Sequence, residues 1–563
     1  MSFFPFVSSH HSRLRVSALA ALSVSSASPR EPRVVREEWG SIWRRLTILI
    51  VAVLTAGCGD GADYDVIIRN GTIVDGTGAD PFVADLGIRD ERIIAVGALD
   101  TATAERVLDA SGLHVASGFI DVHSHSGGGL ETPELSTAHA LLAQGITTVA
   151  INPDGGGAID LAAQRTRLLD HGLGVNVAQL VPHGAIRTEV LGNSARDPEP
   201  DELERMKALV LAGMEEGAFG LSSGLFYTPG SWSKTEEVIA MARVTAPYGG
   251  VYTSHIRDEA DYTIGVVAAV DEVIRIAREG GVTGIVSHVK ALGPNVWGTS
   301  EQIVANIEAA RAEGVNVWAD QYPYDASATG FVSALVPAWA REGDGVEGRL
   351  DDPATAMRIR AEVTENLARR GGGERIMFRG RGPFAGRTLA DVAAEREQDE
   401  LAAAIDLIRS RDVDGIVSFN MHEDDIAHFM RQPWTMTSSD GDLTPFGEGV
   451  PHPRNYGAFP RKIREYVVEQ EIVDLPTAIR SMTGLSAEVF GITDRGVVRE
   501  GAFADIVVFD LDRFNDPATF DDPHRLAEGV VHILVNGSLA IVDEAFTDEV
   551  AGQVLRRVGP DGN

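Results

Sequence analysis

Apolar positions in the middle of the chain alternate between short continuous runs and segments in which they recur at helical spacing. Such alternation is typical of βα units built around a parallel sheet. Helices are expected between most of the runs, as at residues 202–216 and 267–279. The runs themselves are expected to form eight strands, at residues 119–122, 147–151, 175–180, 218–222, 251–253, 283–286, 315–319 and 434–437. They predict an α/β fold, a TIM-like (β/α)8 barrel, over residues 118–494.

Both ends of this barrel are flanked by a different pattern, in which short alternating runs are separated by glycine and aspartate. The pattern fills residues 65–115 and returns at 501–510 and 530–537, and it predicts small antiparallel β-structure. We therefore expect a small β-sandwich domain formed from both termini, residues 64–117 plus 495–545.

The connection after the seventh expected strand is far longer than an ordinary loop between two barrel elements. We therefore expect an insert, or lid, at residues 328–431 within the barrel.

The beginning of the chain has the pattern of an export signal. Arg44 and Arg45 precede an apolar run at residues 46–54 that is too short to span a bilayer, and the run leads to Cys58. This resembles a bacterial lipoprotein signal, which implies a leader at residues 1–57 and a lipid anchor on Cys58. The protein would then lie in the bacterial cell envelope, facing the periplasm or the exterior. A signal that is cleaved without lipidation stays open.

Charge and cysteine content narrow the possible functions. The chain has 49 Lys+Arg and 82 Asp+Glu, a net charge of −33, which repels nucleic acid and anionic membranes. We therefore expect no nucleic-acid partner, and membrane contact only through a lipid anchor. Cys58 is the single cysteine, so the rest of the chain has no thiol for a disulfide or a metal.

Metal-ligating residue types gather where the expected strands end. Active sites of (β/α)8 barrels are built from the carboxyl ends of the strands. Two histidines that alternate along a strand can reach one ion together. The candidates at these ends are His123, His125, Asp154, His183, His255, His288 and Asp440. Five histidines and two carboxylates on one rim predict a metal site with room for water.

Eight short motifs follow one another along the chain: GFIDVHSH at 118–125, GITTV at 145–149, EGAFGLSSGL at 216–225, YTSHIRDE at 252–259, SHVK at 287–290, YPY at 322–324, SDG at 439–441 and HPR at 452–454. In this order they make the chain resemble the amidohydrolase superfamily and within it the N-acyl-D-amino-acid deacylase (D-aminoacylase) family. The resemblance covers residues 65 to about 543.

The resemblance implies hydrolysis of the amide bond of an N-acyl-D-amino acid, with release of a carboxylate and a D-amino acid. It implies one or two divalent metal ions, zinc in the family, held tightly at His255 and His288 and more weakly near His123 and His125. Asp440 would then take a proton from the metal-bound water and pass it to the leaving amine.

The substrate implied by the resemblance is a small molecule with a free carboxylate. Lys290, Tyr322 and Arg454 match the residues that hold this carboxylate in the family. We place His183 on the substrate-binding side as well.

One position departs from the family pattern, because Asp154 stands where many relatives have a zinc-binding cysteine. A carboxylate can also bridge metals, so sites with one ion and with two ions both stay open, as does a purely turn-forming Asp154. Two alternative functions also stay open. The first is a dipeptidase or cyclic-amide hydrolase of the same superfamily, and the second is a non-catalytic envelope lipoprotein that binds metal or peptide.

Overall fold

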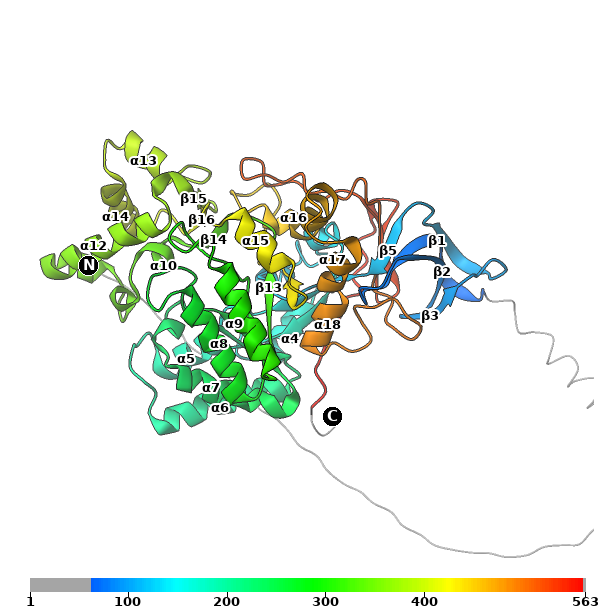
Figure 1. The fold of residues 1–563 in the computed structure, drawn as a ribbon, viewed down its shortest axis with the longest axis horizontal. Helices are drawn as coiled ribbons and strands as arrows, with labels where there is room; N and C mark the ends of the chain where they lie inside the picture. Colours follow the sequence, from blue (N-terminus) through cyan, green and yellow to red (C-terminus); the bar gives the residue numbers. More distant parts are fainter. Residues whose placement is uncertain (1–61, 560–563) are drawn as a thin grey trace, which may run out of the picture. The chain divides into compact units, whose positions relative to one another are not determined.

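The computed structural model describes residues 62–559 (Figure 1). The expected leader at residues 1–57 and its Cys58 lie outside these residues. No helix in residues 62–559 combines the length and the apolar character that crossing a membrane requires.

Every strand expected for the barrel is present, with bounds shifted by no more than two residues. The strands in chain order are β6 (Phe119–Asp121), β7 (Ile146–Ile151), β8 (Asn176–Gln179) with its continuation β9 (Val181–Pro182), β10 (Gly220–Gly224), β11 (Val251–His255), β12 (Thr283–Val286), β13 (Val317–Gln321) and β17 (Thr435–Thr437). All neighbours pair in parallel. The circle closes beyond the ends of β17 and β6, where the Asp440 amide donates to the His123 carbonyl (3.0 Å) and the His125 amide donates to the Gly441 carbonyl (2.9 Å). The predicted barrel is confirmed.

Helices cover the outside of the barrel strands (Figure 1). They include α4 (Leu161–Leu169), α6 (Pro200–Glu215), α7 (Thr235–Thr245), α8 (Val266–Gly280) and α9 (Ser300–Ala312). Helix α6 begins with a capping box between Glu199 and Glu202, and helix α8 buries an apolar face that includes Val270 and Val273. Both helices predicted from the periodicity, 202–216 and 267–279, are therefore confirmed.

The strands from the two ends of the chain form one nine-stranded sheet. The N-terminal part supplies β1 (Tyr64–Val74), β2 (Phe82–Arg89), β3 (Arg92–Gly97), β4 (Ala104–Asp109) and β5 (His114–Ser117), and the C-terminal part supplies β18 (Ile506–Phe509), β19 (Val530–Val535), β20 (Ser538–Val542) and β21 (Ala545–Phe546). Strand β5 pairs with β18 and so joins the two ends.

The expectation of purely antiparallel pairing in this sheet is wrong for β1. One half of this long strand pairs in parallel with β4 and the other half in parallel with β5, with an irregularity between Ile68 and Gly71. Alternation of apolar and polar residues sets which face is buried but not the direction of the neighbouring strand, so the pattern could not predict these pairs.

The insert is a small α/β unit with its own core. Its strands are β14 (Ser327–Gly330), β15 (Ile376–Arg379) and β16 (Gly415–Ser418), with β16 in the centre, and its helices include α10 (Phe331–Leu335), α12 (Pro353–Arg369), α13 (Leu389–Glu395) and α14 (Glu400–Ser410). The core contains Phe331, Phe378 and Ile416. The predicted range 328–431 extends too far, because the next helix, α15 (Glu423–Met430), belongs to the barrel. Its Asp425 carboxylate accepts from the amides of Gly298 (2.9 Å) and Ser300 (3.3 Å) at the start of α9.

A buried lysine supports the strand that closes the barrel. Lys462 begins the π-helical segment Lys462–Glu469, and its Nζ donates to the hydroxyls of Thr437 at the end of β17 (2.8 Å) and Ser481 (2.8 Å). Within residues 62–559 these hydroxyls are its partners and no carboxylate pairs with it, and burial lowers its pKa to about 7.

We expect Lys462→Met to stabilise the protein more at pH 6 than at pH 9. The folded-state pKa of Lys462 is about 7 against an ordinary value of 10.5, so the cost of burying the ammonium is full below pH 7 and falls as the pH rises towards 10.5. The gain in free energy of unfolding should be larger at pH 6 by about 3 kcal/mol. Denaturant titrations at both pH values measure it, with Lys207→Met, at a partly exposed lysine, as the control. An equal gain at the two pH values would contradict the expectation.

Candidate metal centre

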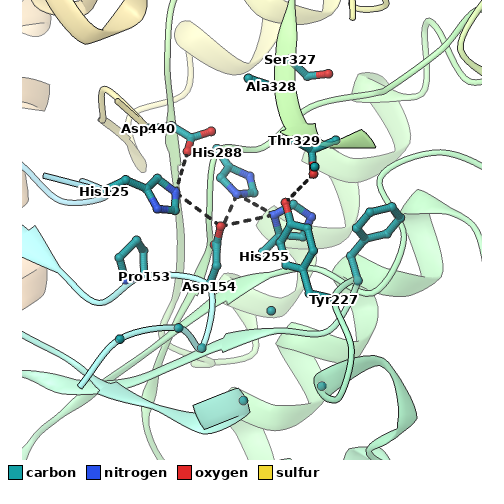
Figure 2. Close-up of a pocket in the computed structure, with 18 of the residues that line it drawn as sticks. His125, Pro153, Asp154, Tyr227, His255, His288, Ser327, Ala328, Thr329 and Asp440 are labelled. Carbon is teal, nitrogen blue, oxygen red and sulfur yellow. Dashed lines mark hydrogen bonds and ion pairs between the residues drawn. The ribbon is translucent and has the colours of Figure 1, made fainter. Parts of the chain in front are cut away.

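Four of the predicted histidines meet at the carboxyl ends of the barrel strands. Figure 2 shows His125, His255 and His288 among them. His123 and His125 follow β6, His255 ends β11, and His288 follows β12. His255 Nδ1 and His288 Nε2 are 2.9 Å apart. They lie at a cavity of about 620 Å³ whose wall includes residues of both the barrel and the insert.

The Asp154 carboxylate lies between the two histidine pairs. Its Oδ1 is 3.3 Å from His123 Nε2 and 3.6 Å from His288 Nε2. Its Oδ2 is 3.6 Å from His125 Nε2 and 3.7 Å from His255 Nδ1. Each carboxylate oxygen therefore faces one histidine of each pair, as a group bridging two neighbouring positions would.

The loop after β7 holds Asp154 in an uncommon backbone conformation. Asn152 and Asp154 have φ of 62° and 56°, in the left-handed region that Asn and Asp tolerate better than most residues. The Asn152 side chain donates to Gln164 Oε1 (2.8 Å) and to the Leu180 carbonyl (3.1 Å), and the Gly155 amide donates to Ser222 Oγ (3.2 Å). These bonds fix the direction of the Asp154 carboxylate, which a merely turn-forming residue would not need.

Asp440 approaches the histidines from the opposite side, on the loop after β17. Its Oδ1 lies 3.2 Å from His125 Nε2 and 3.7 Å from His123 Nε2, and its Oδ2 lies 2.9 Å from an Nη1 atom of Arg454. Burial raises the pKa of Asp440, but Arg454 and His288 outweigh it and hold that pKa well below its usual range. The group is therefore a carboxylate at neutral pH.

The donor atoms fit a divalent metal by spacing and by type. Bonds of about 2.0–2.1 Å in a tetrahedral site place neighbouring ligand atoms about 3.3–3.4 Å apart. The nitrogen-to-oxygen distances within the groups His123/Asp154/His288 and His123/His125/Asp440 are 3.2–3.7 Å. In residues 62–559, His123 Nε2, His255 Nε2 and Asp154 Oδ1 are buried without any hydrogen-bond partner. These residues can hold one or two ions.

Glu259 is a further group of this centre that the sequence reasoning did not single out. Its Oε1 is 3.2 Å from His288 Nδ1, and its Oε2 is 3.6 Å from His255 Nε2. Burial raises its pKa, but Lys290 beside it lowers that pKa well below the usual range. In the sequence, Glu259 stands four residues after His255 in the YTSHIRDE motif. This spacing alone does not place Glu259 at the same site as His255, because it does not specify the path of the loop between them.

Two buried aspartates accept hydrogen bonds from the backbone amides of the candidate metal ligands. Asp320 accepts from the His288 amide (2.9 Å) and from Ser438 Oγ (2.7 Å). Asp121 accepts from the His123 and Ser439 amides and from the Ser439 hydroxyl, and burial raises its pKa to about 6. Such outer partners orient the residues that bind a metal.

The three residues expected to bind a substrate carboxylate, Lys290, Tyr322 and Arg454, all line the cavity. The guanidinium of Arg454 lies 4.8 Å from the centre of the Tyr322 ring, and its buried Nε has no partner among the described residues. Lys290 Nζ is already bonded to Glu259 Oε1 (2.5 Å) and His288 Nδ1 (2.7 Å).

His183 does not reach the cavity, which corrects its placement on the substrate-binding side. It is fully buried at the start of α5 (His183–Leu191), and its Nε2 lies 3.0 Å from Glu237 Oε1 on α7. Glu237 also pairs with the buried Arg187. Because the helix begins at His183 itself, the ring turns outward into this ion-pair cluster, while the following residue, Gly184, lines the cavity.

The chain also matches the family model described as "Amidohydrolase family" over residues 106–541. It is 35% identical to the N-acyl-D-glutamate deacylase of Alcaligenes xylosoxydans xylosoxydans over 515 residues, which cover 88% of this chain and 96% of that relative. The chain therefore belongs to the amidohydrolase family. Within it, the chain is a member of the N-acyl-D-amino-acid deacylase (D-aminoacylase) group.

Two solved structures extend this likeness to the fold. One is the N-acyl-D-glutamate deacylase from Bordetella bronchiseptica complexed with zinc and a phosphonate inhibitor, with a TM-score of 0.74, 36% identity, and coverage of 88% of this chain and 99% of that one. The other is a D-aminoacylase with a binuclear metal centre, with a TM-score of 0.75, 32% identity, and coverage of 88% and 100%.

We expect Asp154→Ala to weaken zinc binding by at least about tenfold, because the variant removes the one carboxylate that faces all four histidines. Asp154→Cys should retain zinc, since a thiolate is a good zinc ligand. The zinc content of the wild type and of each variant is measured after dialysis against increasing concentrations of a chelator. Asp170→Ala, at an exposed aspartate, is the control. Equal zinc retention by Asp154→Ala and the wild type would show that Asp154 is no ligand.

Proposed function

We propose that the protein is a metal-dependent deacylase that hydrolyses the amide bond of N-acyl-D-amino acids and releases a carboxylate and a D-amino acid. The observation that carries this proposal is the position of Asp440 at the cavity, where a carboxylate that is ionised in the resting protein contacts His125 on one side and Arg454 on the other. A pure metal-binding protein has no use for that group. The activities named for the relatives support the same class of substrate.

Zinc is the metal we propose, held by His123, His125, Asp154, His255 and His288. When bound, it would polarise the amide carbonyl and make a water molecule more acidic. The histidine nitrogens and one carboxylate are a donor set suited to zinc.

Asp440 moves the proton in this proposal. Its Oδ1 faces the histidines and can accept a proton from the attacking water, while Arg454 holds Oδ2 and fixes the carboxylate's orientation. The same oxygen then donates the proton to the nitrogen of the leaving amine. The left-handed backbone of Asp440 (φ 49°) aims this side chain into the cavity.

The substrate carboxylate would lie against Arg454 and Tyr322. Arg454 has a buried Nε with no partner in residues 62–559, so its guanidinium keeps donors for a second carboxylate while it contacts Asp440. Lys290 contributes positive charge but is already bonded to Glu259. With the amide group at the metal centre and the carboxylate at Arg454, the side chain of a D substrate and that of an L substrate would point in different directions, so the cavity wall can distinguish the two enantiomers.

We expect the zinc-loaded protein to hydrolyse N-acetyl-D-amino acids and not their L enantiomers. Asp440→Asn should lower kcat by about 10² or more, because the amide cannot carry the proton. Initial rates on a D/L panel measure both effects, with Asp512→Asn, at an exposed aspartate, as the control. No hydrolysis of any D substrate, with Asp440→Asn indistinguishable from the wild type, would overturn the proposal.

We also propose that the protein is tethered to the bacterial cell envelope through a lipid on Cys58. Arg44 and Arg45, the apolar run at residues 46–54 and the cysteine that follows support this location.

In a bacterial host, the full chain should therefore fractionate with membranes, and Cys58→Ser should move it to the soluble fraction. Fractionation after labelling with a radioactive fatty acid measures both the location and the modification. Wild-type protein that is unlabelled and soluble would contradict the anchor.

A further inference from the structure

Arg370 is a cation of the cavity wall that lacks a carboxylate. It follows α12 in the insert and is 1% exposed, and it lines the same cavity as the metal centre. Its Nη1 donates to Ser418 Oγ at the end of β16 (3.0 Å), and its Nε is buried without any partner in the described part of the chain. The guanidinium lies 5.8 Å from the centre of the Tyr262 ring.

The other cations that line the cavity each have a carboxylate of their own. Lys290 pairs with Glu259 (2.5 Å), Arg379 with Asp442 (3.0 Å) and Arg454 with Asp440 (2.9 Å). Within residues 62–559, Arg370 has no ion pair with any Asp or Glu, and its recorded side-chain hydrogen bond is the one to Ser418. A buried guanidinium with one neutral partner is costly, and a carboxylate is the group whose geometry its donors match.

The arginine that precedes Arg370 in the sequence does have carboxylate partners. Arg369 is adjacent in sequence, but it pairs with Asp261 (3.3 Å) and Glu365 (3.6 Å) and does not line the cavity. Arg369 is directed towards solvent and is neutralised by carboxylates. Arg370 is directed towards the cavity and is not.

We propose that Arg370, with Ser418, binds a second carboxylate of the substrate, so that the enzyme prefers N-acyl-D-amino acids carrying two acidic groups. This inference rests on the proposed deacylase function, in which Arg454 and Tyr322 hold the α-carboxylate. The second carboxylate comes either from the side chain of the amino acid or from the acyl group. Arg370 directly follows α12 and Ser418 ends β16, and both of these elements belong to the insert (Figure 1). In this proposal the insert selects the substrate while the barrel carries the chemistry.

The test compares kcat/KM for matched acidic and neutral substrates in the zinc-loaded wild type and in Arg370→Gln. N-acetyl-D-glutamate against N-acetyl-D-glutamine tests the side chain, and N-succinyl-D-leucine against N-butanoyl-D-leucine tests the acyl group. The wild type should prefer the acidic member of one pair. Arg370→Gln should lower kcat/KM for that member at least about 30-fold, mainly through KM, and leave the neutral substrates within about threefold.

Two further variants separate binding from folding. Arg369→Gln should leave the preference unchanged. Arg370→Met should have a Tm at or above that of the wild type without substrate, because it removes an unpaired buried charge. A lower Tm of Arg370→Met would indicate a structural arginine and overturn the proposal. Equal losses on acidic and neutral substrates, or no acidic preference in the wild type, would also overturn it.

Failure of the deacylase function itself would be recognised separately. If no D substrate is hydrolysed, the proposed reaction is wrong, and equilibrium binding of N-acetyl-D-glutamate and N-acetyl-D-glutamine to the zinc-loaded protein still tests Arg370. Tighter binding of the acid that is lost in Arg370→Gln would support the second-carboxylate site, and equal binding of the two compounds would refute it.

Discussion

The contact of one buried carboxylate, that of Asp154, with four imidazoles is the interaction on which the site depends. Three acidic groups, Asp154, Asp440 and Glu259, lie in one buried cluster, and their mutual repulsion must be balanced by cations. Burial lowers the pKa of His125, but Asp154 and Asp440 outweigh it and raise that pKa to about 10. The negative charge that keeps a proton on the His125 imidazole also attracts a divalent cation. The cation and the proton compete for the same nitrogen lone pair.

The barrel brings these groups together because its parallel strands all end on the same rim. The closure of the barrel uses the same residues as the site, since the backbone bonds that join the ends of β17 and β6 are made by Asp440 to His123 and by His125 to Gly441. Asp121 strengthens this closure, because one carboxylate accepts amides from both segments. Displacing β17 would therefore move Asp440 away from the histidines, which couples the stability of the barrel to the geometry of its chemistry.

Sequence patterns predicted the strands and the rim residues because both follow directly from periodicity and from chain order. The eight barrel runs are mostly apolar, and polar residues near their carboxyl ends mark the rim. Features that depend on side-chain direction after a strand were not predictable. His183 lies at the carboxyl end of a strand, as His255 and His288 do, yet it turns outward because α5 begins there. The place of Glu259 beside His255 and His288 likewise depends on a loop whose path no periodicity specifies.

The insert and the barrel are joined at the site by an aromatic contact. Tyr227, on the loop after β10, packs against His255 with ring centres 4.6 Å apart and ring planes tilted by 50°, and its hydroxyl is 3.1 Å from Thr329 Oγ1 on β14 of the insert. The insert therefore has a fixed position relative to the histidines, so a charge that it carries can be placed precisely. A buried arginine without a carboxylate lowers the free energy of unfolding of the free protein. When the arginine is held rigidly, a substrate carboxylate that neutralises it on binding restores that free energy. Arg370 satisfies both conditions, whereas Arg369 beside it is partly exposed and paired with carboxylates.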